Sequence, residues 1–199
     1  MVDKKKKSKL SLKIQWKEAL KYIYECREQI YVIITLFFVS SILGFVFSEK
    51  LGFIEMYLRE ILLKVEGLDG FELTFFILQN NVQSAFFSMI FGVFLGLSAI
   101  FNTIGNGVVL GYVSSLVVRE GSVVDLWRLL PHGVFELLGV FISLGLGLKL
   151  AGFAFVRYGR KLKELKRRFY NSINVFLFVV LPLLILAAII EGVLIAFFG

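Results

Sequence analysis

Cysteine, histidine and proline are scarce in this chain of 199 residues, which contains one cysteine, one histidine and two prolines. A single cysteine cannot form an internal disulfide. The sequence also lacks a phosphate-binding glycine loop, a nucleophile elbow and the Cys-x-x-Cys and His-Glu-x-x-His motifs. These absences argue against an enzyme, and we expect no metal and no cofactor.

Charge is sparse as well. Charged residues make up 19% of the chain and hydrophobic residues 58%, and the mean hydropathy is +0.82. Soluble domains contain about 45–50% apolar residues, so a soluble fold of this length could not bury so much apolar surface. Lipid accommodates it, because a helix of about 20 apolar residues satisfies its own backbone hydrogen bonds. We therefore predict an all-α fold, a polytopic membrane helix bundle of about five transmembrane helices.

Five apolar stretches set the expected spans. The uncharged run that follows Glu72 is too long for one crossing and too short for three, so we place two spans in it. The turn between them is expected at 102–107, because glycine and asparagine tolerate left-handed backbone. Pro131 suits the first turn of the fourth helix. The expected spans are 30–48, 75–101, 105–118, 131–152 and 173–198.

Two amphipathic helices are expected outside the spans. Residues 1–29 begin with a lysine-rich run, expected to be a flexible tail, and continue as a helix for the inner membrane surface. A second helix, at about 51–66, carries Glu55 and Arg59 on the face opposite its apolar residues. We therefore divide the chain into a basic cytoplasmic segment, 1–29, and a transmembrane domain, 30–199.

The basic residues are divided unevenly between the two sides of the predicted bundle. Nine precede the first span and eight lie between Lys149 and Arg168, whereas three lie in 48–72 and two in 119–130. The positive-inside rule then places the N-terminus and the 153–172 loop in the cytoplasm and the C-terminus outside. We interpret the net charge of +7 as this orientation signal and expect no nucleic-acid partner. The expected location is the cytoplasmic membrane, as a multi-pass protein.

Small residues recur at every fourth position in three of the spans, a pattern that lets helix backbones approach closely. Together with the helix at 51–66 they offer more adhesive surface than five spans need, so we expect a homodimer or small homo-oligomer. The glycines expected at helix contacts are Gly92, Gly96, Gly107, Gly111, Gly133, Gly139 and Gly147.

An ionisable pair lies inside the fourth span. His132 and Glu136 are four residues apart and share a helix face with Gly139, Ser143 and Gly147. A charge in a span costs at least about 2–3 kcal/mol near the centre, so we expect this face to point inward. A hydrogen-bonded structural cluster, a proton or cation site and, with only two ligands in view, a metal site all remain open. The predicted polar intramembrane site comprises His132, Glu136, Gln79, Asn80, Asn81 and Asn106.

Several short motifs resemble the stage II sporulation protein M family of bacterial and archaeal membrane proteins. The resemblance covers about 30–198 and agrees with the five-span prediction. The motifs that carry it are the pair Asn80 and Asn81 ahead of Gly92, Asn106 and Gly107 followed by Gly111, and Pro131, His132 and Gly133 followed by Glu136, Gly145 and Gly147.

The resemblance implies a non-enzymatic membrane scaffold, because the sporulation member is regarded as an anchor that localises peptidoglycan-remodelling partners at a septum. We therefore expect a scaffold or assembly protein whose partners are membrane lipids, further copies of itself and unidentified membrane or extracytoplasmic proteins. The alternative is a channel or transporter of ions, lipids or small solutes that uses the polar site. An intramembrane hydrolase that uses Glu136 is a weaker option.

Overall fold

The computed structural model describes residues 2–119, 130–157 and 159–198, without the side chains of 2–11, 130–132, 195 and 198. All of its regular elements in these ranges are helical, which confirms the predicted all-α class. A π-helical turn, Phe176–Val180, joins the last two helices, and 3-10 turns lie at Ser48–Lys50 and Gly152–Phe155. The helices are α1 (Val2–Glu25), α2 (Arg27–Val46), α3 (Gly52–Val65), α4 (Gly70–Phe91), α5 (Leu97–Arg119), α6 (Leu130–Ala151), α7 (Lys161–Val175) and α8 (Leu181–Phe198).

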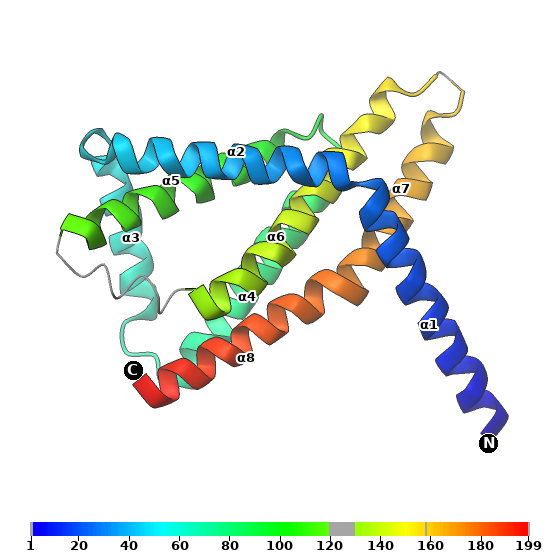
Figure 1. The fold of residues 1–199 in the computed structure, drawn as a ribbon, viewed down its shortest axis with the longest axis horizontal. Coiled ribbons are helices and arrows are strands. Elements are labelled where there is room, and N and C mark those ends of the chain that lie inside the picture. The colour runs from blue at the N-terminus through cyan, green and yellow to red at the C-terminus, as the bar shows by residue number, and fades with distance from the viewer. Residues whose placement is uncertain (1, 120–129, 158, 199) are drawn as a thin grey trace.

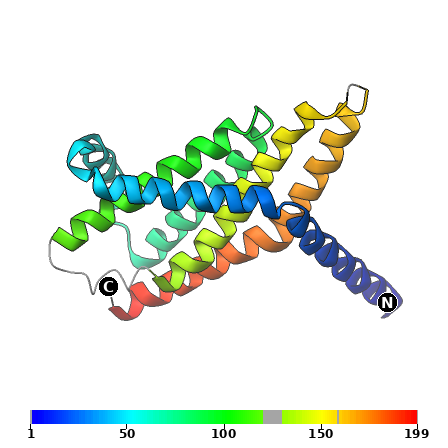
Figure 2. The same ribbon diagram turned by 45° about the horizontal axis from the view of Figure 1, so that its top comes forward.

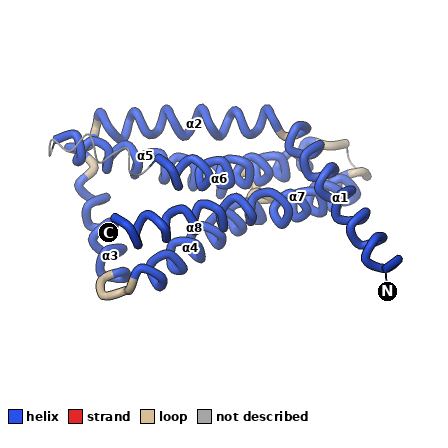
Figure 3. The backbone as a smooth tube through the Cα atoms, turned by 60° about the horizontal axis from the view of Figure 1, so that its bottom comes forward, coloured by secondary structure: helices blue, strands red, loops and turns tan. Residues whose placement is uncertain are grey.

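The long helices run back and forth along one bundle. Figure 1 shows α2 beside α5, and α4, α6 and α8 packed together below them. α6 is central, because it contacts α2, α4, α5 and α8. α1 projects from the bundle at the start of α2 (Figure 2), although its second half packs against α7. α3 crosses between the layers at the opposite end (Figure 3). We call these the α1 end and the α3 end of the bundle.

Four helical segments of the described chain are long and apolar enough to cross a membrane: Arg27–Val46, Leu97–Arg119, Gly133–Phe155 and Lys161–Leu194. α4 traverses the bundle beside them, but its amide-rich segment 79–83 lowers its hydropathy. These segments fit a multi-pass membrane protein. The fifth crossing and the direction of insertion stay predictions.

The turn between the second and third spans lies elsewhere than predicted. The expected spans 75–101 and 105–118 placed it at 102–107, but these residues belong to α5, and the chain turns at 92–96. The predicted bounds of both spans were therefore wrong.

The physical reason is local hydrogen bonding. Asn106 Nδ2 donates to the carbonyl oxygen of Asn102 at 2.9 Å, so the asparagine bonds back along the helix rather than ending it. Thr103 Oγ1 does the same with Ala99 at 2.6 Å. The observed turn instead takes its left-handed backbone from Leu95 and Gly96, and the φ of Gly96 is 73°.

The amphipathic segments are helical. α3 matches the predicted helix at 51–66 closely. α1 extends back to Val2, so the lysine-rich run expected to be a flexible tail is helical instead, because it continues the register of the amphipathic segment that follows it. The basic stretch before the fifth span continues through the π-helical turn into α8.

Glycines bring two pairs of helices into backbone contact. A Cβ on Gly107 would lie 2.5 Å from the Phe37 carbonyl oxygen of α2, and one on Gly111 would lie 2.7 Å from the Phe45 nitrogen. α4 and α6 approach equally closely where a Cβ on Gly92 would lie 2.5 Å from the Cα of Gly147. Such contacts stabilise helix pairs in lipid, where the hydrophobic effect does not.

The other three predicted packing glycines differ. Gly139 lies against Leu184 of α8, 3.1 Å from the position of an added Cβ. Gly96 belongs to the turn, not to a helix, but it packs against α6, because a Cβ there would lie 2.8 Å from Leu148 Cδ1. A Cβ on Gly133 would meet nothing within 4 Å. Of these three glycines, Gly133 alone has no neighbour among the described residues where its Cβ would be.

Candidate functional site

A set of serines and asparagines links α4 to α5, and we call it the polar ladder: Ser84, Ser88, Ser98, Asn102 and Asn106. Ser98 Oγ donates to the Ser88 carbonyl oxygen at 3.1 Å, and Asn102 Nδ2 donates to Ser84 Oγ at 3.0 Å. Asn106 Nδ2 donates to Asn102 Oδ1 at 2.7 Å. The ladder thus ascends α5 from the connecting turn toward the α3 end, over about 12 Å at 1.5 Å per residue.

Asn106 is the exposed end of this ladder. It lies near the middle of the candidate span Leu97–Arg119, yet its side chain is exposed. α4 and α5 diverge from their turn toward the α3 end (Figures 1 and 3). Lipid offers no hydrogen bonds, so an exposed amide at this depth is costly unless another polar group covers it.

Glu136 faces the same region from α6. It shares a helix face with Ser143 and Gly147. Ser143 Oγ donates to the Ala85 carbonyl oxygen of α4 at 2.8 Å, and Gly147 lies against Ser88, so this face points toward α4. The Glu136 side chain is half-buried there. The structure does not describe the His132 side chain, so the predicted pairing of His132 with Glu136 stays a prediction.

The four neighbouring amides of α4 point in different directions. Asn81 is half-buried on the face that also carries Ala85, about one helical turn from the level of Glu136. Gln79, Asn80 and Gln83 are exposed. Gln79 lies on the opposite side of α4 from Asn81, which separates it from Glu136. Of the predicted amide partners, Asn81 alone shares the inward face.

The sequence prediction missed Asn102 and its bond to Ser84. Asn102 had been assigned to a turn, whereas its spacing of four from Ser98 and from Asn106 places all three on one face of an unbroken helix. That spacing could have revealed the ladder. Its partner on α4 could not be identified, because it depends on where the chain turns.

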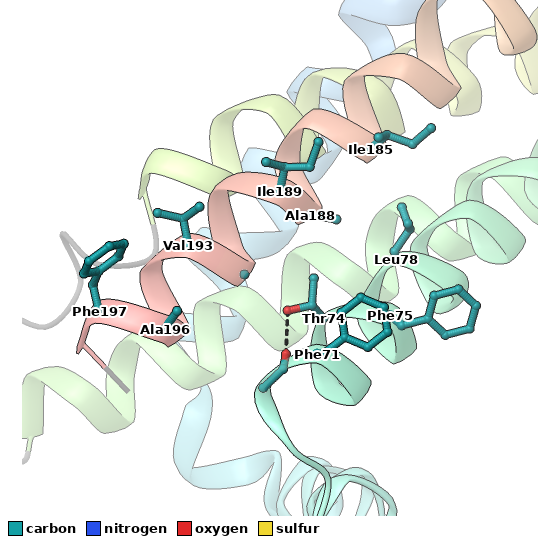
Figure 4. A pocket seen from close by; sticks show the side chains of 12 residues that line it. Phe71, Thr74, Phe75, Leu78, Ile185, Ala188, Ile189, Val193, Ala196 and Phe197 are labelled. Atoms are coloured by element: carbon teal, nitrogen blue, oxygen red, sulfur yellow. Dashed lines mark hydrogen bonds between the residues drawn. The ribbon is translucent and has the colours of Figure 1, made fainter.

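An apolar groove of about 690 Å³ separates α4 from α8 near the α3 end. Its lining side chains are almost all aliphatic or aromatic (Figure 4). Thr74 Oγ1 donates to the Gly70 carbonyl oxygen at 2.8 Å, so its hydroxyl is satisfied within its own helix. The groove offers little to a polar solute.

The α1 end contains buried ionisable groups with a structural role. Burial raises the pKa of the Cys26 thiol to about 11 and also raises the pKa of Tyr22, so both are protonated at neutral pH. Lys149 Nζ donates to the Glu25 carbonyl oxygen at 3.0 Å, and Arg168 donates to the Lys149 carbonyl oxygen at 2.6 Å. These bonds join α1, α6 and α7. Among the described residues, no group of three His, Cys, Asp or Glu side chains could hold a metal ion.

Comparison with protein families gives a match over most of the chain. The model of the family described as stage II sporulation protein M matches residues 32–194, which confirms the resemblance predicted from the motifs. No curated protein and no solved structure matches the chain.

Proposed function

Because the chain belongs to the stage II sporulation protein M family, we propose that it is a non-enzymatic scaffold that assembles other proteins in the cytoplasmic membrane. In this proposal a transmembrane segment of a partner lies against the polar ladder and Glu136. The observation that carries it is the exposed amide of Asn106 in the middle of a candidate span.

The chemistry of the region suits a helix rather than a lipid chain. Interhelical hydrogen bonds from asparagine and serine contribute about 0.6 kcal/mol each on average in membranes, and up to about 2 kcal/mol. Asn106 uses its Nδ2 on Asn102, so its Oδ1 can accept a hydrogen bond from a partner. Glu136 and Asn81 lie further toward the α3 end of the same region. A partner helix with serine, threonine or asparagine residues would satisfy Asn106 Oδ1.

Site-specific photo-crosslinking in living cells tests the proposal. A photoreactive residue at position 106 should form a protein adduct, whereas the same residue at Phe101 should label lipid, because Phe101 is 69% exposed on another face of α5 at similar depth. Asn106→Leu should then reduce co-purification of the adduct partner, and Phe101→Leu should not. Only lipid adducts at position 106 would exclude a partner helix there.

Transport is the second candidate, and Glu136 is the observation that favours it. A carboxylate half-buried beside a ladder of amides could bind and release a proton or cation along the bundle. Flux of protons or cations into proteoliposomes should then be lost in Glu136→Gln, while partner capture through position 106 stays intact. Equal flux in empty liposomes and in the wild-type preparation would eliminate this alternative.

A further inference from the structure

One face of α4 has the spacing of a helix-packing surface, and none of the described helices packs against it. Its residues, which we call the α4 outer stripe, are Asn80, Gln83, Phe87, Phe91 and Phe94, the last in the turn that follows. All five side chains are exposed. Their successive separations of three, four, four and three residues are those of side chains that interlock between paired helices.

Apart from Gln79, the other residues of α4 from Leu78 onward are buried or half-buried. Leu78 and Met89, on the opposite side, belong to the core formed with α6 and the segment around α8. Ser84 and Ser88 bond to α5. The outer stripe is therefore the side of α4 that points away from the bundle.

The two halves of the stripe differ in chemistry. Toward the α1 end, Phe91 stacks on Phe87 with ring centroids 5.9 Å apart and on Phe94 with centroids 6.4 Å apart. This pre-ordered aromatic surface could pack against another helix at low entropic cost. Toward the α3 end, the amides of Asn80 and Gln83 face outward at the middle of the helix, where lipid cannot satisfy them.

We infer that the α4 outer stripe binds the same stripe of a second copy of this chain, forming a two-fold symmetric dimer in the membrane. A two-fold axis along the membrane normal places each residue at the same depth in both copies. An amide can pair with an identical amide, because it carries both a donor and an acceptor. A carboxylate or ammonium at the same position would instead repel its copy.

This dimer uses a different surface from the glycines on which the prediction of an oligomer from the sequence rested. Gly92, Gly107, Gly111 and Gly147 make backbone contacts within the chain and are not available to a second copy. The dimer is tested at Asn80 and Gln83 and the partner helix at Asn106, so the two experiments are separate. Either proposal can fail without the other.

Disulfide crosslinking in native membranes tests the dimer. Cysteines are introduced singly at Asn80 and at Gln83, in a Cys26→Ser background. The control is Leu186→Cys on α8, at the same depth as Asn80. Thr74 of α4 lies against Gly192 of α8. Because the two helices are antiparallel, Asn80, six residues after Thr74, lies level with Leu186, six residues before Gly192. Leu186 is 41% exposed, so it is accessible to random collisions.

We expect Asn80→Cys and Gln83→Cys to form dimers of twice the chain mass under mild oxidation, and Leu186→Cys to stay monomeric. The double variant Asn80→Leu with Gln83→Leu should remain folded, because leucine suits a lipid-facing surface, but should dimerise about tenfold more weakly in lipid nanodiscs. Equal crosslinking at Leu186, a single subunit per nanodisc for the wild type, unchanged dimerisation of the double variant or crosslinks only to another protein would each overturn the inference.

Discussion

The contact between α2 and α5 permits a sharp prediction for Gly111→Ala. The added methyl group would be placed against the backbone of Ser41 and 2.7 Å from the nitrogen of Phe45. Backbone atoms cannot rotate away as a side chain can, so the two helices must separate. Overpacking of this kind costs about 1–3 kcal/mol. At about 2–4 °C per kcal/mol for a chain of this size, the midpoint of thermal unfolding should fall by roughly 2–12 °C.

Gly105→Ala is the matched control, because it makes the same chemical change on the same helix. A Cβ at Gly105 would meet nothing within 4 Å, and the residue lies inside α5. Replacing glycine by alanine in a helix gains up to about 1 kcal/mol, so its melting midpoint should be unchanged or higher. Heating in detergent followed by size-exclusion chromatography measures both variants beside the wild type.

Two results would refute this reasoning. An unchanged midpoint in Gly111→Ala would mean that α2 and α5 do not meet at this backbone contact. A lowered midpoint in Gly105→Ala would mean that 102–107 forms a turn after all, as the sequence alone had suggested.

Three further predictions concern the rest of the chain. Ser143→Ala should destabilise the fold by about 0.5–1.5 kcal/mol in detergent unfolding, because it removes the bond to Ala85; an unchanged unfolding midpoint would contradict this. Cys26, fully buried and with its pKa raised to about 11, should resist maleimide at pH 7–8 until the protein is denatured, and fast labelling of the folded protein would show that α1 detaches. Because Cys26 does not react, an impermeant thiol reagent should reach a cysteine at Ser122 from outside and one at Lys163 only after permeabilisation. The reverse pattern would show that the topology is opposite to the predicted one.

Much of the fold follows from hydropathy, because a membrane helix must satisfy its backbone internally and so leaves a long apolar run. The bounds of α2 and α6 could be predicted within a few residues, since charged or turn-forming residues flank them. The break between α4 and α5 could not. Glycine and asparagine occur in membrane helices and in turns alike, and the uncharged run offered two such clusters, at 92–96 and 102–107.

Part of the candidate site could likewise be predicted because it depends on one helix, and part could not because it depends on how two helices meet. The inward face of Glu136 follows from its spacing to Ser143 and Gly147, a property of one helix that the sequence contains. The bond between Asn102 and Ser84 depends on the register between two helices, and that register depends on the turn. The amides of α4 were grouped by sequence, yet a helix turns by about 100° per residue, so Asn81 and its neighbour Asn80 diverge.

The difference between five predicted crossings and four sufficiently apolar helices has a physical explanation in α4. This helix traverses the bundle and packs against α6 and α8, yet its serines, asparagines and glutamines keep it from being among the four candidate spans of the described chain. Ser84 and Ser88 bind α5, Asn81 faces the core, and Asn80 and Gln83 face outward. Each polar group lowers the tendency of α4 to enter lipid alone, so α4 should be stable in the membrane only when its neighbours, and on the outer stripe a second copy, supply the hydrogen bonds that lipid does not.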